Sequence, residues 1–250
     1  MKKYRIVIYV FTVLCFEVNV LKRIKIYSEV VYLIAQFGLT LAVAILAAAD
    51  FGVSMVVAPA YILNLKFPLF SFGEWGYIVQ GVLFAAFCIA IKKIKPIYFM
   101  SFVTCVIYGY ILDMWRAVIP FLNPNITQPG EFDLWIRILM FIVGEFLTSF
   151  MVMLFFKSYI YPQVCDFVVK GIVEKYKLDQ VKFKRIYDMS TLLVAIVLAQ
   201  ALFGGFVGIG WGTVVIALIT SPLMGVFGKW YDKHVETVPL FPKLEKIFEI

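Results

Sequence analysis

The feature that most limits how this chain can fold is a series of long apolar segments separated by short polar ones. Each approaches the roughly 20 apolar residues that a helix needs to cross a bilayer. Of the 250 residues, 63% are hydrophobic and 16% are charged, whereas a soluble domain has about 25% charged residues. The sequence therefore predicts an all-α, polytopic helical membrane protein. The expected spans are 28–48, 76–91, 97–119, 134–156, 189–204 and 212–228.

An earlier apolar run, residues 6–20, is interrupted by Glu17 and Asn19. It predicts an N-terminal hydrophobic helix. Basic residues flank it on both sides, which suits a helix lying flat in the membrane interface. The run is compatible with both a seventh membrane span and a helix in the interface.

The basic residues indicate topology. A net charge of +7 would suggest nucleic acid for a soluble protein, but here Lys and Arg lie between apolar segments, where they set orientation and contact lipid headgroups. Basic-rich connections (92–95, 157–185) alternate with connections that lack basic residues (120–133, 205–211). The positive-inside rule places the C-terminus in the cytoplasm. The expected partner is the lipid bilayer, and no nucleic acid is expected.

The two halves of the chain have the same order of elements. Each has a span, a short apolar run (53–65 and Val164–Tyr176) and two further spans. Three spans per half insert the second half from the opposite side, which predicts an inverted repeat with short broken or re-entrant helices, as in many transporters. Short helices lying on the surface are the alternative. The predicted parts are 1–27 (N-terminal helix), 28–119 and 134–229 (repeats), 120–133 (external loop) and 230–250 (cytoplasmic tail).

Motifs for enzymatic chemistry are missing from the sequence. The four cysteines have no CxxC spacing, and His234 is the single histidine. There is no Walker loop, dinucleotide fingerprint or GxSxG. We therefore expect no metal, no cofactor and no enzymatic activity.

Acidic residues within apolar segments are candidates for ion coupling, because a charge at the bilayer centre costs about 2.5–3.5 kcal/mol on insertion scales. Glu145 lies near the middle of the fourth span and is the main candidate for proton coupling. A buried carboxyl hydrogen-bonded to a neighbouring helix is the alternative. Asp113 is a second coupling candidate, although Arg116 three residues on favours a local ion pair. Asp133 and Arg137, four residues apart at the entry to the fourth span, are likewise expected to form an ion pair.

Polar groups near the short helices predict a solute site. Ser54 is expected to cap the first short helix, and Pro162 suits the first turn of the second. Two helix N-termini near the core favour an anionic or strongly polar solute. Asp188 is expected to be a charge at the start of the fifth span. The candidate binding residues are Ser54, Pro59, Tyr61, Gln80, Tyr108, Glu145, Tyr161 and Gln163.

A family resemblance covers about residues 28–229. It is carried by "ADFGVSMVVAPAYIL", "SFGEWGYIVQG", "SFVTCVIYGYILD", "YPQVCDFVVKGI" and "GIGWGTVVIALITSPLMGVF", in this order. These motifs resemble the bacterial YczE/YitT-like integral membrane proteins, in particular a subgroup of unknown function. The resemblance implies a multi-pass protein of the bacterial cytoplasmic membrane and names no substrate.

The sequence favours a secondary transporter or permease for a small polar or anionic solute, working by alternating access. The first alternative is a membrane-embedded accessory or substrate-binding subunit that acts with a partner protein. An intramembrane enzyme is disfavoured. Whether the chain forms a homo-oligomer stays open.

The charge pattern makes a topological prediction. In a cysteine-free background, single cysteines placed in 120–131 should react with an impermeant maleimide on intact cells, because this connection lacks basic residues. Cysteines placed in 175–184 should react only after permeabilisation. Labelling of both segments from one side would contradict the inverted arrangement.

Overall fold

The computed structural model describes residues 23–52, 54–70, 72–123, 126–127 and 131–248. Six helices in this part are long and apolar enough to cross a membrane, which confirms the predicted polytopic helical class. The run 6–20 lies outside the described residues. The long helices are α2 (Ser28–Ala49), α4 (Phe72–Ile91), α5 (Met100–Val118), α6 (Leu134–Lys157), α8 (Gln180–Phe203) and α9 (Trp211–His234).

The shorter elements lie between or beside the long helices. They are β1 (Ile24–Tyr27), α3 (Ala58–Lys66), the 3-10 turns η1 (Pro96–Phe99) and η2 (Pro120–Leu122), α7 (Val164–Tyr176), β2 (Val235–Val238) and α10 (Pro242–Ile247). The second predicted short helix has its predicted bounds. The first is helical only from Ala58, because Pro59 fits the first helical turn, where no intrahelical N–H donor is needed.

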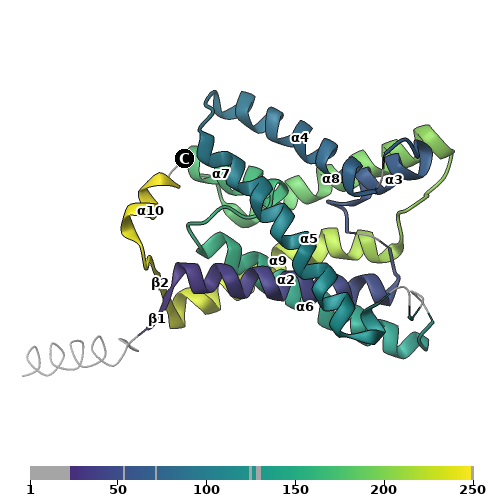
Figure 1. The fold of residues 1–250 in the computed structure, drawn as a ribbon, viewed down its shortest axis with the longest axis horizontal. Coiled ribbons are helices and arrows are strands. Elements are labelled where there is room, and N and C mark those ends of the chain that lie inside the picture. The colour runs from purple at the N-terminus through teal and green to yellow at the C-terminus, as the bar shows by residue number, and fades with distance from the viewer. Residues whose placement is uncertain (1–22, 53, 71, 124–125, 128–130, 249–250) are drawn as a thin grey trace, which may run out of the picture.

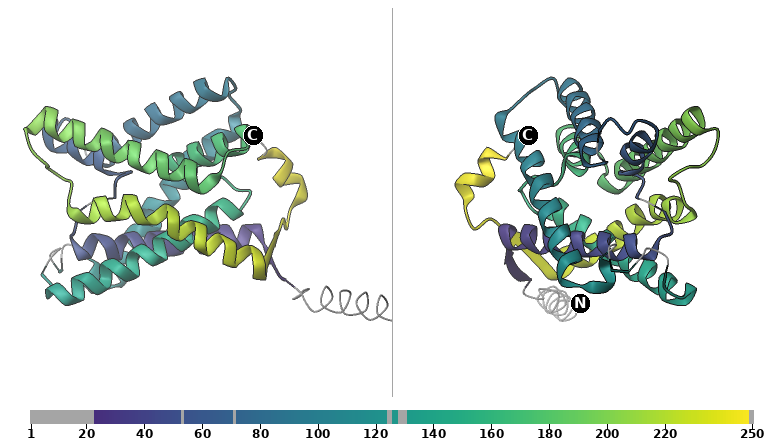
Figure 2. Two further views of the ribbon diagram at one scale, coloured as in Figure 1. Left: turned by 180° about the vertical axis from the view of Figure 1, so that it is seen from behind. Right: turned by 45° about the vertical axis from the view of Figure 1, so that its right-hand side comes forward.

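The helices form two layers joined by α5 (Figures 1 and 2). In one layer α2 packs along α6, and α6 packs on α9. In the other, α3 and α7 each pack on both α4 and α8. Helix α5 crosses from α2 to α7, and α8 packs along α9. In contrast, α4 and α5 make no comparable contact with each other.

Small residues set the contact between α2 and α6. A Cβ atom added at Gly38 would lie 2.5 Å from Sδ of Met151, and one added at Gly144 would lie 2.8 Å from Cγ of Leu46. Each glycine therefore receives a large side chain of the facing helix, as is common where membrane helices approach closely.

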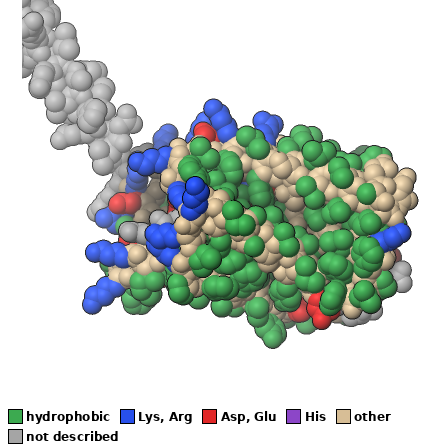
Figure 3. Space-filling model, turned by 90° about the horizontal axis from the view of Figure 1, so that it is seen from above, with side chains coloured by type: hydrophobic (Ala, Val, Ile, Leu, Met, Phe, Trp, Pro, Cys, Tyr) green, Lys and Arg blue, Asp and Glu red, His purple; other side chains and the backbone are tan. Residues whose placement is uncertain are grey.

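The outer surface of the long helices is apolar. Ile89, Leu139 and Val197 are between 57% and 76% exposed. Figure 3 shows hydrophobic side chains over the middle of one face, with Lys and Arg gathered mostly toward one end. An exposed apolar belt of this extent indicates contact with lipid.

The C-terminal segment is held against the start of α2. Strands β1 and β2 pair in parallel, with Ile24 opposite Val235. The Glu29 carboxylate then accepts hydrogen bonds from the backbone N–H groups of Leu240 (3.0 Å) and Phe241 (3.1 Å) and from the Tyr159 hydroxyl (2.6 Å). We call β1, β2 and residues 239–248 the tail clasp. It covers the end of the bundle at which α2 begins (Figure 1).

The hydrogen bonds of Glu29 predict how the tail clasp responds to mutation. Hydrogen bonds to a charged group contribute about 1.5–3 kcal/mol each. Glu29→Ala should therefore accelerate trypsin cleavage at Lys243 and Lys246 by at least about fivefold, as followed by mass spectrometry. Glu236→Ala, which removes a solvent-exposed ion pair with Lys25, is the matched control and should cleave like the wild type. Equal rates for both variants would contradict this role of Glu29.

Candidate solute pocket

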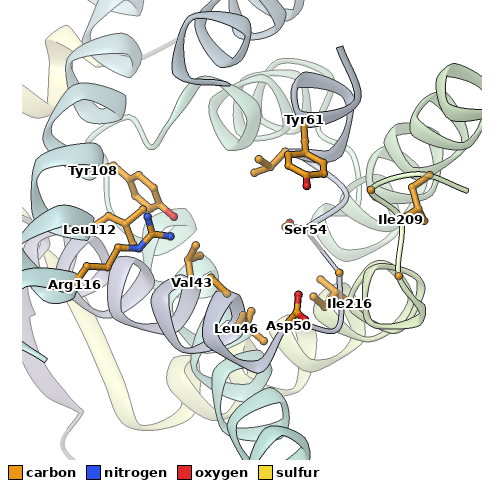
Figure 4. A pocket seen from close by; sticks show the side chains of 15 residues that line it. Val43, Leu46, Asp50, Ser54, Tyr61, Tyr108, Leu112, Arg116, Ile209 and Ile216 are labelled. Atoms are coloured by element: carbon orange, nitrogen blue, oxygen red, sulfur yellow. The ribbon is translucent and has the colours of Figure 1, made fainter. Parts of the chain in front are cut away.

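A pocket of about 540 Å³ lies at the end of the bundle opposite the tail clasp (Figure 4). Its walls come from the last turns of α2, from α5, from the chain leading into α3, and from the connection between α8 and α9. The lining is mainly apolar, with five side chains that carry polar groups: Asp50, Ser54, Tyr61, Tyr108 and Arg116.

Two loops meet at the base of this pocket. Helix α2 ends at Asp50, whose φ of 53° turns the chain sharply. The backbone N–H of Gly212 then donates to the carbonyl oxygen of Phe51 at 2.9 Å. A Cβ atom added at Gly210 would lie 2.2 Å from that oxygen, so the close approach of the two loops requires glycine. Gly52, at φ +115°, faces the same loop from the other side.

Arg116 projects from α5 into the pocket (Figure 4). The predicted ion pair with Asp113 is wrong: Asp113 is exposed, and no ion pair joins the two side chains in the described structure. Tyr108, Leu112 and Arg116 are spaced four residues apart and therefore share one face of α5. That face turns toward the pocket, which directs Arg116 away from Asp113.

The predicted pair of Asp133 and Arg137 is also wrong. Arg137 instead reaches the end of α2, where its Nε donates to the carbonyl of Ala49 at 2.9 Å and its Nη2 to that of Asp50 at 2.7 Å. The same Nη2 lies 3.5 Å from Oδ2 of Asp50. The unpaired carbonyl groups at a helix C-terminus attract a cation, and this attraction outweighs the local spacing.

The predicted binding residues are distributed over both ends of the bundle. Ser54, Tyr61 and Tyr108 line the pocket together, and Pro59 is buried in the adjacent first turn of α3. Gln80, on α4, instead accepts a hydrogen bond from Cys105.

Tyr161 and Gln163 lie at the opposite end of the bundle. The buried Tyr161 hydroxyl donates to the carbonyl of Phe248 in the tail clasp, and Gln163 is the N-cap of α7. These two residues therefore do not line the pocket.

The predicted capping geometry does not form. The N-cap of α3 is Val57, and the carbonyl oxygen of Ser54, not its hydroxyl, accepts the N–H groups of Val57 and Ala58. Pro162 precedes the N-cap Gln163 and lies outside α7. The pocket is thus polar through the side chains of Asp50, Ser54, Tyr61, Tyr108 and Arg116 rather than through two capped helix ends.

Glu145 is 3% exposed and lies away from the pocket, between α6 and α9. Its Oε1 is 2.8 Å from Oγ1 of Thr220 and 3.1 Å from Oγ of Ser149, while Oε2 has no hydrogen-bond partner among the described residues. Thr220 Oγ1 is also 2.7 Å from the carbonyl of Ile216. Because a hydroxyl has one hydrogen, Thr220 donates to one of these two oxygens at a time.

A buried charge cluster joins α7, α8 and α9. Lys184 Nζ lies 2.6 Å from Asp188 and 3.1 Å from Asp166, and the Ser221 hydroxyl donates to Asp188 at 3.1 Å. The prediction that Asp188 is a terminus charge is wrong, since it is 0% exposed. Helix α8 begins at Gln180 rather than Met189, where the Asp179 side chain accepts the backbone N–H of Lys182 as an N-cap. Lys184 and Asp188 then pair inside the helix. Their i,i+4 spacing was the signal in the sequence.

Lys170 on α7 is buried near the tail clasp. Its ammonium donates to the carbonyl groups of Ser158 and Ile160, just beyond the end of α6. Burial lowers the pKa of Lys170 to about 8, while the nearby Glu174 carboxylate opposes this shift. Lys170 therefore satisfies the C-terminus of α6 as Arg137 satisfies that of α2.

In the part of the chain that the structure describes, no group of three or more His, Cys, Asp or Glu side chains is placed to hold a metal ion. Six spanning helices with an internal pocket at one end define a polytopic helical membrane protein. The chain belongs to a family of unknown function, DUF6198, whose profile matches residues 26–229. Comparison with curated proteins and with solved structures gave no match.

The charge cluster predicts a large loss of stability on mutation of Lys184. Lys184→Met leaves two carboxylates close together without their cation, which typically costs about 3–5 kcal/mol. Chemical unfolding in micelles should show this loss. Adding Asp188→Asn should restore part of it, whereas Lys182→Met, at an exposed position on the same helix, should be near neutral. A single variant as stable as the wild type would show that the cluster contributes little.

Proposed function

We propose that this protein is a secondary transporter of the bacterial cytoplasmic membrane that moves a small polar or anionic solute by alternating access. The pocket is its substrate site. The observation that carries this proposal is the difference between the two ends of the bundle. One end has a pocket between the two halves, whereas at the other Phe248 of the tail clasp packs on Tyr159 and Tyr161. This is the arrangement expected of a transporter open to one side.

An inverted repeat would supply the second state. Exchanging the halves replaces α2, α3, α4 and α5 by α6, α7, α8 and α9. The contact of α3 with α8 then corresponds to that of α7 with α4, and the contact of α2 with α5 to that of α6 with α9. These matched pairs support the repeat. The contact between α8 and α9 is extensive, whereas α4 and α5 meet only through a few side chains such as Gln80 and Cys105, so the present state is asymmetric, as alternating access requires.

Two finer assignments belong to the same proposal. The matched family of unknown function is consistent with the YczE/YitT-like resemblance. The positive-inside rule would place the tail clasp in the cytoplasm and the pocket on the outer side.

Proton coupling through Glu145 is supported by the geometry of Thr220. When Glu145 is ionised, Thr220 donates to Oε1. When it is protonated, the carboxyl can donate to Thr220, whose hydrogen then turns to the carbonyl of Ile216, 2.7 Å away. The hydrogen bond between Oε1 of Glu145 and Thr220 can therefore form in each protonation state with its donor and acceptor exchanged, and the change reaches α9.

An accessory subunit acting with a partner protein is the second candidate. It is favoured by the exposed apolar side chains of α4 and α5, such as Val82, Ile89 and Tyr110, which are 66%, 76% and 74% exposed. A partner helix packed there would add to the sparse contact between α4 and α5. Purified protein alone would then carry no flux.

Reconstitution tests the proposal and its coupling. Proteoliposomes should take up components of a defined metabolite mixture, followed by mass spectrometry, beyond the level of empty liposomes. A pH gradient should drive accumulation. Glu145→Gln should abolish this accumulation but retain solute exchange, because the amide mimics a permanently protonated carboxyl. Glu236→Gln in the exposed tail is the control.

Two other outcomes are informative. If Glu145 is only structural, Glu145→Gln should lower the free energy of unfolding by about 1–3 kcal/mol and leave gradient-driven uptake intact. No uptake of any component by the wild type would count against transport by this chain alone.

A further inference from the structure

We infer that the pocket binds an amphipathic organic monoanion, whose carboxylate or phosphate is held by Arg116 and whose hydrocarbon part lies against the apolar lining. This inference rests on the proposed function for its meaning in transport, but the binding itself can be measured separately. Three properties of the pocket support it: a cation that makes no ion pair or hydrogen bond with a described residue, a carboxylate on another wall, and a large apolar surface.

The cation is the first property. The Arg116 guanidinium points into the pocket, and no hydrogen bond or ion pair joins it to a described residue (Figure 4). A guanidinium is always charged and presents five donors in a planar fork that matches carboxylate or phosphate oxygens. Arg137 shows the contrast, because its Nε and Nη2 donate to groups at the end of α2. Arg116 is thus available for an anion.

The carboxylate of Asp50 limits the charge of the anion that the pocket can bind. Asp50 lines a different wall from Arg116 and is paired with Arg137. Arg116 is therefore the single cation among the lining residues, and the Asp50 carboxylate is offset by Arg137 rather than by Arg116. A second negative charge on the ligand would meet Asp50 rather than a cation, so a dianion is disfavoured.

The third property is the size and lining of the pocket. At about 540 Å³ it is far larger than one inorganic anion and falls within the usual range of organic ligand sites. Around the charged groups the lining is hydrocarbon, from Val43, Leu46, Val57, Leu112, Ile209 and Ile216. An inorganic anion would leave this surface uncovered, whereas the body of an amphipathic ligand buries it.

Two sources share this chemistry. A free organic acid and the phosphodiester headgroup of an anionic lipid are both amphipathic monoanions. The experiment must therefore separate them by composition of the membrane as well as by mutation.

Four probes with one ring but different charge test the inference. Cyclohexanecarboxylate (monoanion), cyclohexanecarboxamide (neutral), cyclohexane-1,4-dicarboxylate (dianion) and 4-aminocyclohexanecarboxylate (zwitterion) are titrated by calorimetry into full-length protein in phosphatidylcholine nanodiscs at pH 7.5. The monoanion should bind at least about tenfold more tightly than each of the others, a difference of about 1.4 kcal/mol.

Variants locate the site. Arg116→Gln should weaken binding of the monoanion at least about tenfold and leave the amide unchanged. Arg185→Gln, at an exposed position outside the pocket, is the matched control and should bind like the wild type. Unfolding temperatures of both variants should match the wild type. If Arg116→Gln fails to fold, Arg116→Lys serves instead, since it keeps the charge but loses the fork and should show a partial loss.

Several results would overturn the inference. They are the absence of monoanion binding, equal binding of the amide, tighter binding of the dianion or zwitterion, and unchanged affinity in folded Arg116→Gln. If phosphatidylglycerol added to the nanodiscs competes with the monoanion probe, the natural ligand is an anionic lipid. If it does not compete, the natural ligand is a free organic acid. Both results keep the inferred anion chemistry. Arg116-dependent binding without flux in proteoliposomes would reject only the proposed function, whereas flux without such binding would reject only this inference.

Discussion

The packing of α2 along α6 is the contact on which the rest of the molecule depends. It is the most extensive helix pair of the described structure and joins the first helix of one half to the first helix of the other. Gly38 and Gly144 each accept a large side chain of the opposite helix, so the two backbones are fixed at close range. The end of α2 then forms a wall of the pocket, and the middle of α6 holds Glu145 against α9. In the proposed transport cycle, the motion that opens the other end would pivot on this pair.

Buried polar groups are distributed unequally between the halves. The cluster of Asp166, Lys184, Asp188 and Ser221 ties three helices of the second half together. In low-dielectric surroundings such a network is strong when satisfied and costly when broken, so it resists deformation. In the first half, the corresponding contact between α4 and α5 is much less extensive. We therefore expect the second half to act as a frame and the first half to carry most of the rearrangement.

Hydropathy was enough to predict the number and approximate position of the spanning helices, because a bilayer sets the length and composition of each. Sequence spacing was not enough to predict ion pairs. Arg116 and Arg137 each have an acidic residue three or four positions away, but one faces a pocket and the other reaches the end of α2. Neither arrangement can be read from the spacing within one helix. The carbonyl groups that Arg137 contacts lie at the end of α2, and the pocket that Arg116 faces has walls from several elements.

Sequence reasoning found only part of the pocket. It grouped Ser54, Tyr61 and Tyr108 as binding candidates, and the fold brings these three into one pocket. The spacing of Tyr108 and Arg116, eight residues apart, placed them on one helix face and could have added Arg116. In contrast, Gly210 shows its importance only through the nearby carbonyl of Phe51.

The tail clasp has a consequence for how the protein is made. Strand β1 precedes the first described spanning helix and β2 follows the last, yet they lie side by side in one parallel pair. During synthesis β1 leaves the ribosome before any of these helices has inserted. Its pairing strand β2 is made only after α9 is complete. Closure of the two strands is therefore a late step in biogenesis. A chain that stalls or is truncated before residue 235 leaves Glu29 without its backbone partners, a mark by which quality control could tell an unfinished chain from a complete one.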